Sequence, residues 1–339
     1  MNKRKSLTYS LAATLLVIAI FFSVGAAAKT KLKVFHAGSL SIPFKQVEEK
    51  FEAEHPDVDV QLEAHGSVVA VRQVTEVGKT GDVVAVADYS LIPSMMEPEY
   101  ADFYLQFAQN RMVLAYREES TLSNKINSDN WYNILADPDV RFGFSNPNMD
   151  PCGYRSPMVM QLAELHYFDS GILNELVLNN SAIEASEADD KYQIRTPEAL
   201  APDTEKLTIR NKSVDLVALV QSGGLDYAFE YMSVSKQHGL EFVTLPRAID
   251  LSSTEYSDTY GKVSVKTADG NVKTAKPIVY GITVPTNSRH PELAREFVKL
   301  IISEAGRSVF SELGQPPIVP ARGFGDVPEA LKNLVEEQN

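Results

Sequence analysis

The sequence predicts an α/β protein built from two domains. Strand and helix patterns alternate from about residue 30, in the order strand 32–36, helix 44–55, strand 58–64, helix 68–77 and strand 83–87. This order is typical of helices packed on a mostly parallel sheet. A chain of 339 residues is also longer than a usual single domain, so we expect two.

The first 28 residues are interpreted as a secretory leader that stands outside this fold. Residues 3–5 are all basic, and the apolar run Leu11–Val24, of 14 residues, follows them. Small residues at 25–28 suit cleavage near Ala28. The run is short for a membrane span and has the usual length of a signal-peptide core. An uncleaved leader would instead anchor the protein, and both cases place the rest of the chain outside the cytoplasm.

The charge of the chain argues against nucleic acid as a partner. The leader carries three positive charges and no acids, so its removal lowers the formal net charge from −13 to −16. Phosphate contacts require a basic surface, which this composition does not favour. The single cysteine, Cys152, excludes an intramolecular disulfide, and a core of this size does not need one.

The dipeptide Gly-Ser stands between a strand and a helix at two places, as Gly38-Ser39 and Gly66-Ser67. The first N–H groups of a helix lack partners within it and lie at the positive end of its dipole, so such a turn can hold an anion. Ligands of open α/β sheets lie at the carboxyl ends of the strands, where the two turns would converge. The plainer interpretation is that Ser39 or Ser41 only caps the following helix, and at this point both remain open.

The rest of the chain continues the alternation. We expect strands at 111–116, 140–144, 207–210, 225–231, 240–245 and 278–284, and helices at 131–135, 157–167, 214–222, 233–238 and 291–310. Ser213 is the expected N-cap of the helix 214–222. Residues 181–206 are polar and acidic and are interpreted as a surface excursion, and 250–276 as a polar hairpin that turns at Asp269-Gly270.

A third strand–helix junction lies at residues 145–156. This loop is dense in turn-forming residues and contains Asp150, Cys152 and Arg155. A further acid, Glu230, lies near the end of the strand at 225–231.

With these junctions identified, the chain resembles the archaeal-type molybdate/tungstate-binding proteins of ABC importers, within the class II periplasmic-binding-protein group. The resemblance covers essentially everything after the leader, and 181–206 matches least well. It is carried by His36-Ala37-Gly38-Ser39-Leu40, His65-Gly66-Ser67, Asn-Pro-Asn-Met-Asp-Pro-Cys-Gly-Tyr-Arg-Ser at 146–156, Asp-Tyr-Ala-Phe-Glu-Tyr at 226–231 and Tyr280-Gly281-Ile282-Thr283. The segment 146–156 is far more specific than a Gly-Ser pair.

The resemblance implies a two-lobed α/β fold, with two mixed sheets flanked by helices and joined by two crossing strands. Lobe one would comprise residues 29–114 plus 283–339, and lobe two residues 115–282. The oxyanion would lie in the cleft, and the lobes would close over it. The implied contacts to its oxo atoms come from Gly38, Ser39 and Ser67 in lobe one and from the backbone of Pro151, Cys152 and Gly153 in lobe two.

The resemblance also implies that the carboxylates of Asp150 and Glu230 bind the metal atom of the oxyanion and raise its coordination from four to six. A carboxylate repels sulfate or phosphate, whose central atoms stay four-coordinate. Molybdenum(VI) and tungsten(VI) are Lewis acids that accept further oxygen donors, so the same acids would select for them. A protonated carboxyl that donates to an oxo atom is the alternative.

Each of these residues also has a plainer interpretation. Asp150 would be a turn residue, and Glu230 a strand-end acid that pairs with Arg210 or lies in solvent. Arg155 would form a structural salt bridge rather than clamp the anion, and the Cys152 side chain would be buried and inert.

The sequence therefore predicts a receptor without enzymatic activity that captures molybdate or tungstate outside the cell. It would deliver the anion to an ABC permease driven by a cytoplasmic ATPase. We expect a monomer, no nucleic-acid partner and no cofactor besides the bound anion. A receptor for sulfate or phosphate is the first alternative, and an exported hydrolase is the second, although the chain lacks the common hydrolase and nucleotide-binding motifs.

Overall fold

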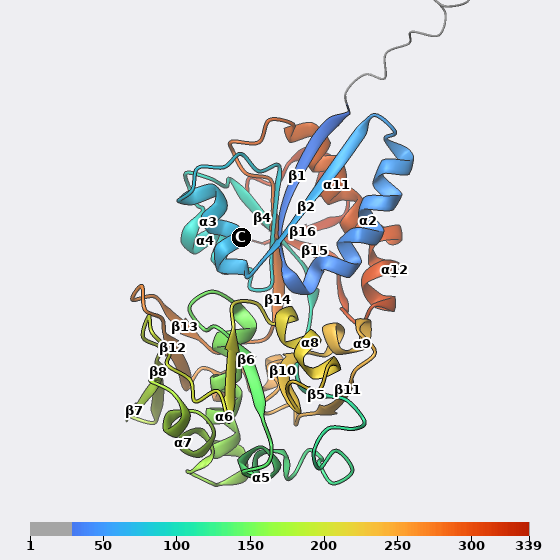
Figure 1. Cartoon of the computed structure of the whole chain (residues 1–339). Coiled ribbons are helices and arrows are strands. Elements are labelled where there is room, and N and C mark those ends of the chain that lie inside the picture. Colours follow the sequence, from blue (N-terminus) through green and yellow to red (C-terminus); the bar gives the residue numbers. More distant parts are fainter. Residues whose placement is uncertain (1–28, 339) are drawn as a thin grey trace, which may run out of the picture.

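The computed structural model describes residues 29–338, so the predicted leader lies outside the described residues. The chain forms two lobes, each built around a mixed β-sheet with helices on its faces (Figure 1). Within residues 29–338, no helix combines the length and apolar character needed to cross a membrane.

Lobe one contains a seven-stranded sheet. Its strands, in spatial order, are β16 (Val335–Glu337), β15 (Pro317–Gly325), β4 (Phe103–Gln109), β14 (Val279–Thr283), β3 (Val83–Val86), β1 (Thr30–Ala37) and β2 (Val58–His65). The strands β1, β2 and β3 pair in parallel, as the strand–helix alternation predicts, whereas β14 pairs with β3 and β4 antiparallel. The prediction missed β4, β15 and β16, and placed only a helix in the tail.

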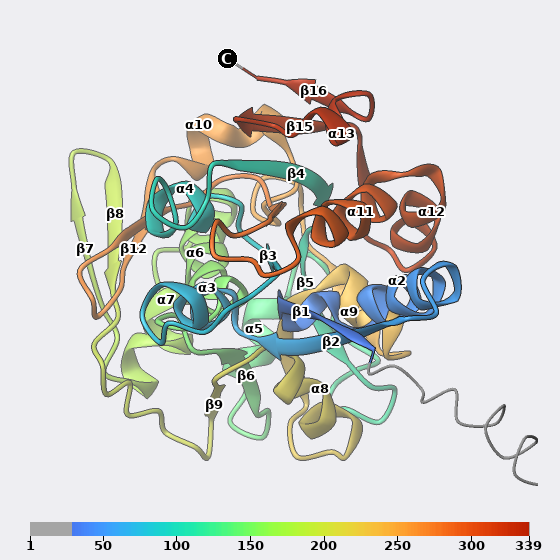
Figure 2. The same ribbon diagram turned by 90° about the horizontal axis from the view of Figure 1, so that it is seen from above.

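Helices cover both faces of this sheet (Figure 2). The helices are η1 (Gly38–Leu40), α2 (Ser41–Glu54), α3 (Ser67–Thr75), α4 (Leu91–Met95), α11 (Pro291–Ile302), α12 (Glu304–Glu312) and α13 (Glu329–Lys332). Phe44 of α2 makes edge-to-face contacts with Phe297 of α11 and Phe310 of α12. The single predicted helix 291–310 is wrong, because the chain breaks at Ser303, whose side chain accepts from the N–H of Gly306 and caps α12.

Lobe two contains a five-stranded sheet. Its strands, in spatial order, are β11 (Glu241–Thr244), β5 (Met112–Tyr116), β10 (Tyr227–Tyr231), β6 (Phe142–Ser145) and β9 (Leu207–Arg210). Its helices are α5 (Trp131–Ala136), α6 (Pro151–Tyr167), α7 (Ile172–Leu176), η2 (Leu178–Asn180), α8 (Val214–Gln221), α9 (Met232–Gln237), η3 (Thr254–Tyr256) and α10 (Ser257–Tyr260).

A third, four-stranded sheet corrects the prediction of two sheets. It joins β13 (Val272–Thr274), β12 (Val263–Lys266), β8 (Lys191–Arg195) and β7 (Glu184–Ala188). The surface excursion predicted at 181–206 therefore contains a β-hairpin, formed by β7 and β8. Its outer strand β7 is exposed along its whole length, so it lacks the apolar alternation by which a strand is recognised. The turn at Asp269-Gly270 is confirmed, but η3 and α10 replace the first part of the predicted hairpin.

The predicted start of the helix at Pro157 is wrong, because α6 begins six residues earlier, at Pro151. It is buried on all sides from Pro151 to Ala163, because it packs between the five-stranded and four-stranded sheets. A helix buried all round shows no apolar stripe in the sequence, so its first turn resembles a loop.

The chain crosses between the lobes twice. It passes from β4 to β5 through Asn110 and returns before β14. The predicted lobe limits at 114 and 283 lie within β5 and at the end of β14. The chain passes from one sheet to the other just before each of these strands. Asn110 joins the crossings, because its Nδ2 donates to Tyr280 Oη of β14 at 3.0 Å and to Ser233 Oγ at 2.7 Å.

Candidate functional site

The predicted site residues meet where the two lobes face each other. From lobe one come η1 and the start of α3, and from lobe two the starts of α6 and α8 and the end of β10. A Cβ on Gly38 would lie 3.1 Å from Cγ2 of Val214, the first residue of α8. The lobes are therefore in direct contact at this edge.

Ser39 lies in η1, directly after β1, and is buried. The Tyr280 hydroxyl donates to Ser39 Oγ at 3.0 Å, and Gln315 Nε2 donates to its carbonyl oxygen at 3.2 Å. The capping interpretation is wrong for both serines: the N-cap of α2 is Leu40, without a side-chain cap, and Ser41 Oγ donates back to Gly38 O. Since Ser39 Oγ already accepts a hydrogen bond, its own hydrogen is the part left to donate.

Ser67 is the first residue of α3 and is buried. The N–H of Ala87, which follows β3, donates to Ser67 Oγ at 2.9 Å. This hydroxyl therefore has the same polarity as that of Ser39, with its hydrogen left for an acceptor. Two such donors suit the oxo atoms of an anion.

Asp150 is the N-cap of α6. Its Oδ1 accepts from Cys152 N–H at 2.9 Å and its Oδ2 from Ser213 N–H at 3.0 Å, so the carboxylate joins the starts of α6 and α8. Burial raises the pKa of Asp150 to about 6, against the lowering effect of these two backbone donors. Ser213 stands before α8 as predicted, but its side chain makes no capping hydrogen bond.

The backbone of 151–153 offers fewer donors than the resemblance implies. Pro151 has no N–H, and the N–H of Cys152 is taken by Asp150. The N–H of Gly153 remains at this helix start. Gly153 lies so close to the end of β6 that a Cβ would stand 2.7 Å from Asn146 O, which explains why a glycine occupies this position.

Glu230 lies in β10 and is fully buried. Its Oε2 accepts from Tyr231 N–H at 2.8 Å, and within residues 29–338 its Oε1 has no hydrogen-bond partner. Burial, helped by the nearby charge of Asp150, raises the pKa of Glu230 to about 8, against the lowering effect of the Tyr231 N–H. The alternatives of pairing with Arg210 or lying in solvent are therefore wrong.

The Cys152 and Arg155 side chains have the structural roles expected of them. Cys152 is fully buried, its Sγ donates to Phe229 O at 3.6 Å, and burial raises the pKa of its thiol. Arg155 is 2% exposed and its Nη2 lies 3.8 Å from Asp88 Oδ2, in a buried salt bridge that crosses between the lobes. Asp88 was not predicted as a site residue, because its only signal in the sequence is an acid that directly follows an apolar strand. The contacts of Tyr280 and Asn110 were not predicted either.

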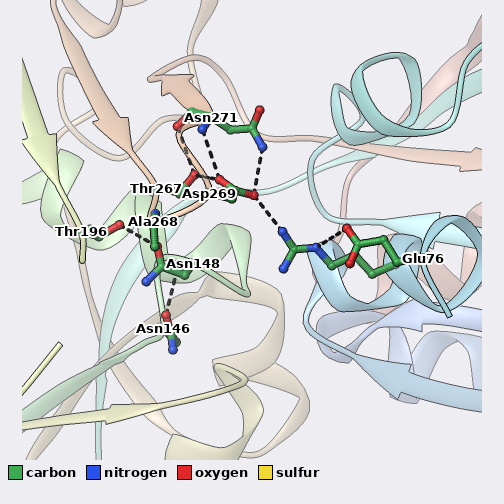
Figure 3. A network of polar contacts seen from close by, with 9 residues as sticks. Glu76, Asn146, Asn148, Thr196, Thr267, Ala268, Asp269 and Asn271 are labelled. Carbon is green, nitrogen blue, oxygen red and sulfur yellow. Dashed lines mark hydrogen bonds and ion pairs between the residues drawn. The ribbon is translucent and has the colours of Figure 1, made fainter. Parts of the chain in front are cut away.

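A second, peripheral contact also joins the lobes. Arg72 of α3 donates from Nη2 to Asp269 Oδ2 in the β12–β13 turn at 2.8 Å, and its Nε lies 3.0 Å from Glu76. Figure 3 shows how this turn is held, with Asp269 beside Asn271 and with Asn148 between Thr196 and Ala268. The hairpin that carries Asp269 belongs to the third sheet, which the sequence analysis did not predict.

The site does not have the donor set of a resident metal ion. Within the part of the chain that the structure describes, no three His, Cys, Asp or Glu side chains form a group able to hold one. The two buried acids belong to lobe two, and the hydroxyls of Ser39 and Ser67 belong to lobe one. Hydroxyl donors and carboxylate oxygens together suit a ligand whose outer oxygen atoms accept hydrogen bonds and whose central atom is electron-poor.

Comparison with known proteins relates this arrangement to a protein family. A family model described as bacterial extracellular solute-binding protein matches residues 32–314. A solute-binding protein of Methanoculleus marisnigri is 52% identical over 314 residues, covering 92% of this chain and 88% of that protein. The molybdate/tungstate-binding protein WtpA of Pyrococcus abyssi is 48% identical over 315 residues and covers 90% of each chain.

A solved structure confirms the predicted fold class. The periplasmic molybdate-binding protein of Azotobacter vinelandii matches with a TM-score of 0.58, over 85% of this chain and 99% of that one. The sequence identity is 15%, so this likeness shows the two-lobed periplasmic-binding-protein fold alone.

Proposed function

This chain belongs to the family of bacterial extracellular solute-binding proteins, and we propose that it captures molybdate or tungstate between its lobes and delivers it to an ABC permease. The family consists of binding proteins rather than enzymes, and the absence of catalysis in this chain is part of the proposal. So are a monomeric state, a cytoplasmic ATPase that drives the permease, and a leader at 1–28 that is cleaved or kept as an anchor.

The observation that carries the proposal is the Oε1 atom of Glu230. Glu230 is fully buried, and its Oε1 has no hydrogen-bond partner within residues 29–338. Asp150, the other acid of lobe two, is close enough for its charge to act on Glu230. Burying an acceptor without a partner raises the free energy of the folded chain. A proton or an electron-poor centre bound to this oxygen would remove that penalty. A hexavalent metal that accepts further oxygen ligands would satisfy it.

The hydroxyl donors complete the fit. Ser39 and Ser67 each have a hydrogen left to donate, and both lie on the lobe that faces the acids. In the proposed complex they hold oxo atoms, while Asp150 and Glu230 bind the metal. Sulfate and phosphate use the same hydroxyls but offer no open coordination position, so the acids only repel them.

Calorimetric titration of the purified chain with each of the four anions tests this function. We expect molybdate and tungstate to bind at least about 100-fold more tightly than sulfate or phosphate, a difference of about 2.7 kcal/mol. Equal affinity for sulfate would overturn the metal-ligand role of the acids and favour a general oxyanion receptor. Turnover of a phosphate or ester substrate that is lost in Asp150→Ala would favour the hydrolase alternative.

A further inference from the structure

Arg155 belongs to lobe two but contacts lobe one. It lies in α6, five residues after Asp150, and only 2% of its surface is exposed. Its Nη1 donates to the carbonyl oxygen of Ala87 at 2.9 Å and to the hydroxyl oxygen of Tyr231 at 2.6 Å. One nitrogen atom thus joins the end of β3 in lobe one to the end of β10 in lobe two.

Both acceptors of Nη1 belong to residues that also hold a proposed anion ligand. The N–H of Ala87 donates to Ser67 Oγ at 2.9 Å, and the N–H of Tyr231 donates to Glu230 Oε2 at 2.8 Å. A series of hydrogen bonds, continued through the covalent bonds of Ala87 and Tyr231, therefore runs from Ser67 through Arg155 to Glu230. It connects a hydroxyl on one lobe with a carboxylate on the other.

Asp88 lies beside the other nitrogen of this guanidinium as a charge partner, although Nη2 forms no hydrogen bond within the described residues. The Tyr154 hydroxyl donates to Asp88 Oδ2 at 2.7 Å, Lys276 Nζ lies 3.2 Å from Oδ1, and Arg155 Nη2 lies 3.8 Å from Oδ2. Asp88 is buried, and its pKa is held well below its usual range by Lys276 and Arg155 in spite of the burial. Removing one partner of such a buried pair leaves a charge without compensation, so the cluster resists separation of the lobes.

We propose that Arg155 is a positioning residue for anion capture, which sets the distance between Ser67 and Glu230 when the lobes close and thereby slows release of the bound anion. The inference rests on the proposed function and assigns Arg155 no contact with the anion. Its contribution depends on geometry, because the planar guanidinium holds two acceptors and an acid at once, which the point charge of a lysine does not reproduce.

The chain offers a matched control in Arg72. Its bond to Asp269 also crosses between the lobes, but the two side chains are 28% and 33% exposed. Its other partner, Glu76, lies on the same helix and holds no site residue. Any ion pair between the lobes could favour closure in a general way, without positioning the anion ligands. In that case Arg72→Gln and Arg155→Lys should change the dissociation rate of the anion by similar factors.

Stopped-flow dissociation of molybdate from the full chain separates the two cases. We expect Arg155→Lys and Tyr231→Phe to raise the dissociation rate about tenfold or more, and Arg72→Gln to raise it less than about threefold. Tyr231→Phe removes one acceptor of Nη1 and keeps the N–H that bonds Glu230, so it guards against misfolding of the Arg155 variant. Equal rates in all three variants, or no change at Arg155 and Tyr231, would overturn the proposal.

A double-mutant cycle provides a readout that a merely structural role would not change. Ser67→Ala and Tyr231→Phe alter the series on opposite sides of Arg155, so we expect their effects on molybdate affinity to be non-additive by about threefold or more. The non-additivity should vanish in the Arg155→Lys background. Additive effects in both backgrounds would contradict the role of Arg155. If the unsubstituted chain binds neither molybdate nor tungstate, the proposed function fails and this inference fails with it.

Discussion

The carbonyl oxygen of Met149 in lobe two lies 2.5 Å from the position that a Cβ atom on Gly66 of lobe one would occupy. The backbone of Gly66 has φ −62° and ψ 141°, which any residue can adopt, so the glycine is required by space and not by conformation. The contact exists only when the lobes are together. The missing side chain of Gly66 therefore matters for the approach of the two lobes, whereas its carbonyl oxygen, which accepts from Ala70 N–H at the start of α3, is unaffected by an added methyl group.

We predict that Gly66→Ala folds normally but does not close. The added methyl group would overlap a backbone oxygen that has no rotamer to change, so the affinity for molybdate should fall by about 100-fold or more while the melting temperature of the anion-free chain stays within a few degrees. Small-angle scattering should show no compaction on addition of the anion.

Gly38→Ala is the matched control. Its Cβ would stand 3.1 Å from a side-chain methyl group of Val214, which can shift by a few tenths of an ångström. We expect a loss of affinity below about fivefold. A loss as large as that of Gly66→Ala would mean that the two lobes tolerate no displacement anywhere along this edge.

Asp150→Asn combined with Glu230→Gln should abolish selectivity for the metal oxyanions. Both substitutions keep the side-chain volume. The single acceptor oxygen of Asn can still cap α6 through Cys152 N–H while the bond to Ser213 N–H is lost, so we expect a folded but less stable variant. Without carboxylate ligands, molybdate and sulfate should bind with affinities within about tenfold of each other. Titration of the folded variant with both anions measures this ratio, and a preserved preference for molybdate would refute the assignment of the two acids.

We predict that His36 makes lobe one less stable in acid. Its side chain is 1% exposed beside Phe44, and burial lowers its pKa from 6.5 to about 4. The unfolded chain therefore binds a proton at a higher pH than the folded chain does. The stability that the neutral imidazole contributes is present above pH 6.5 and is lost as the pH falls towards 4, by about 3 kcal/mol at most.

His36→Gln removes this titration and keeps an amide that can bond Ala37 O. We expect the melting temperature of the variant to decline less than that of the unsubstituted chain between pH 6.5 and 4. Parallel declines would show that other groups control the acid sensitivity.

Gly153→Ala should destabilise lobe two itself. A Cβ there would overlap backbone atoms at the end of β6, within the same lobe, so the first turn of α6 would have to move away from the sheet. We expect a loss of about 2–3 kcal/mol in the free energy of unfolding, measured with denaturant, together with loss of anion binding. An unchanged stability would show that α6 can shift without cost.

The site was predictable as a set of segments but not as a set of contacts. Gly-Ser after a strand indicated Ser39 and Ser67, and the segment around Asp150 carried the family resemblance. Nothing in the sequence pairs Ser67 with Ala87, Tyr280 with Ser39, or Arg155 with Tyr231, because these partners are far apart along the chain. Asp150 illustrates the difference: the sequence shows that it precedes Pro151, but only the structure shows that it accepts from Ser213 N–H.

The α/β class was predictable from the sequence, as were most of the strands and helices around the parallel strands β1, β2 and β3. Local periodicity is enough to indicate such elements. Three features became known only from the tertiary structure: the start of α6, the separation of α11 from α12, and the third sheet, which joins 184–195 to 263–274. Pairing and burial between distant segments outweigh local propensity at such places. The same physical reason separates the residues proposed to hold an anion, which local turns indicate, from those that join the two lobes, which only the packed chain brings together.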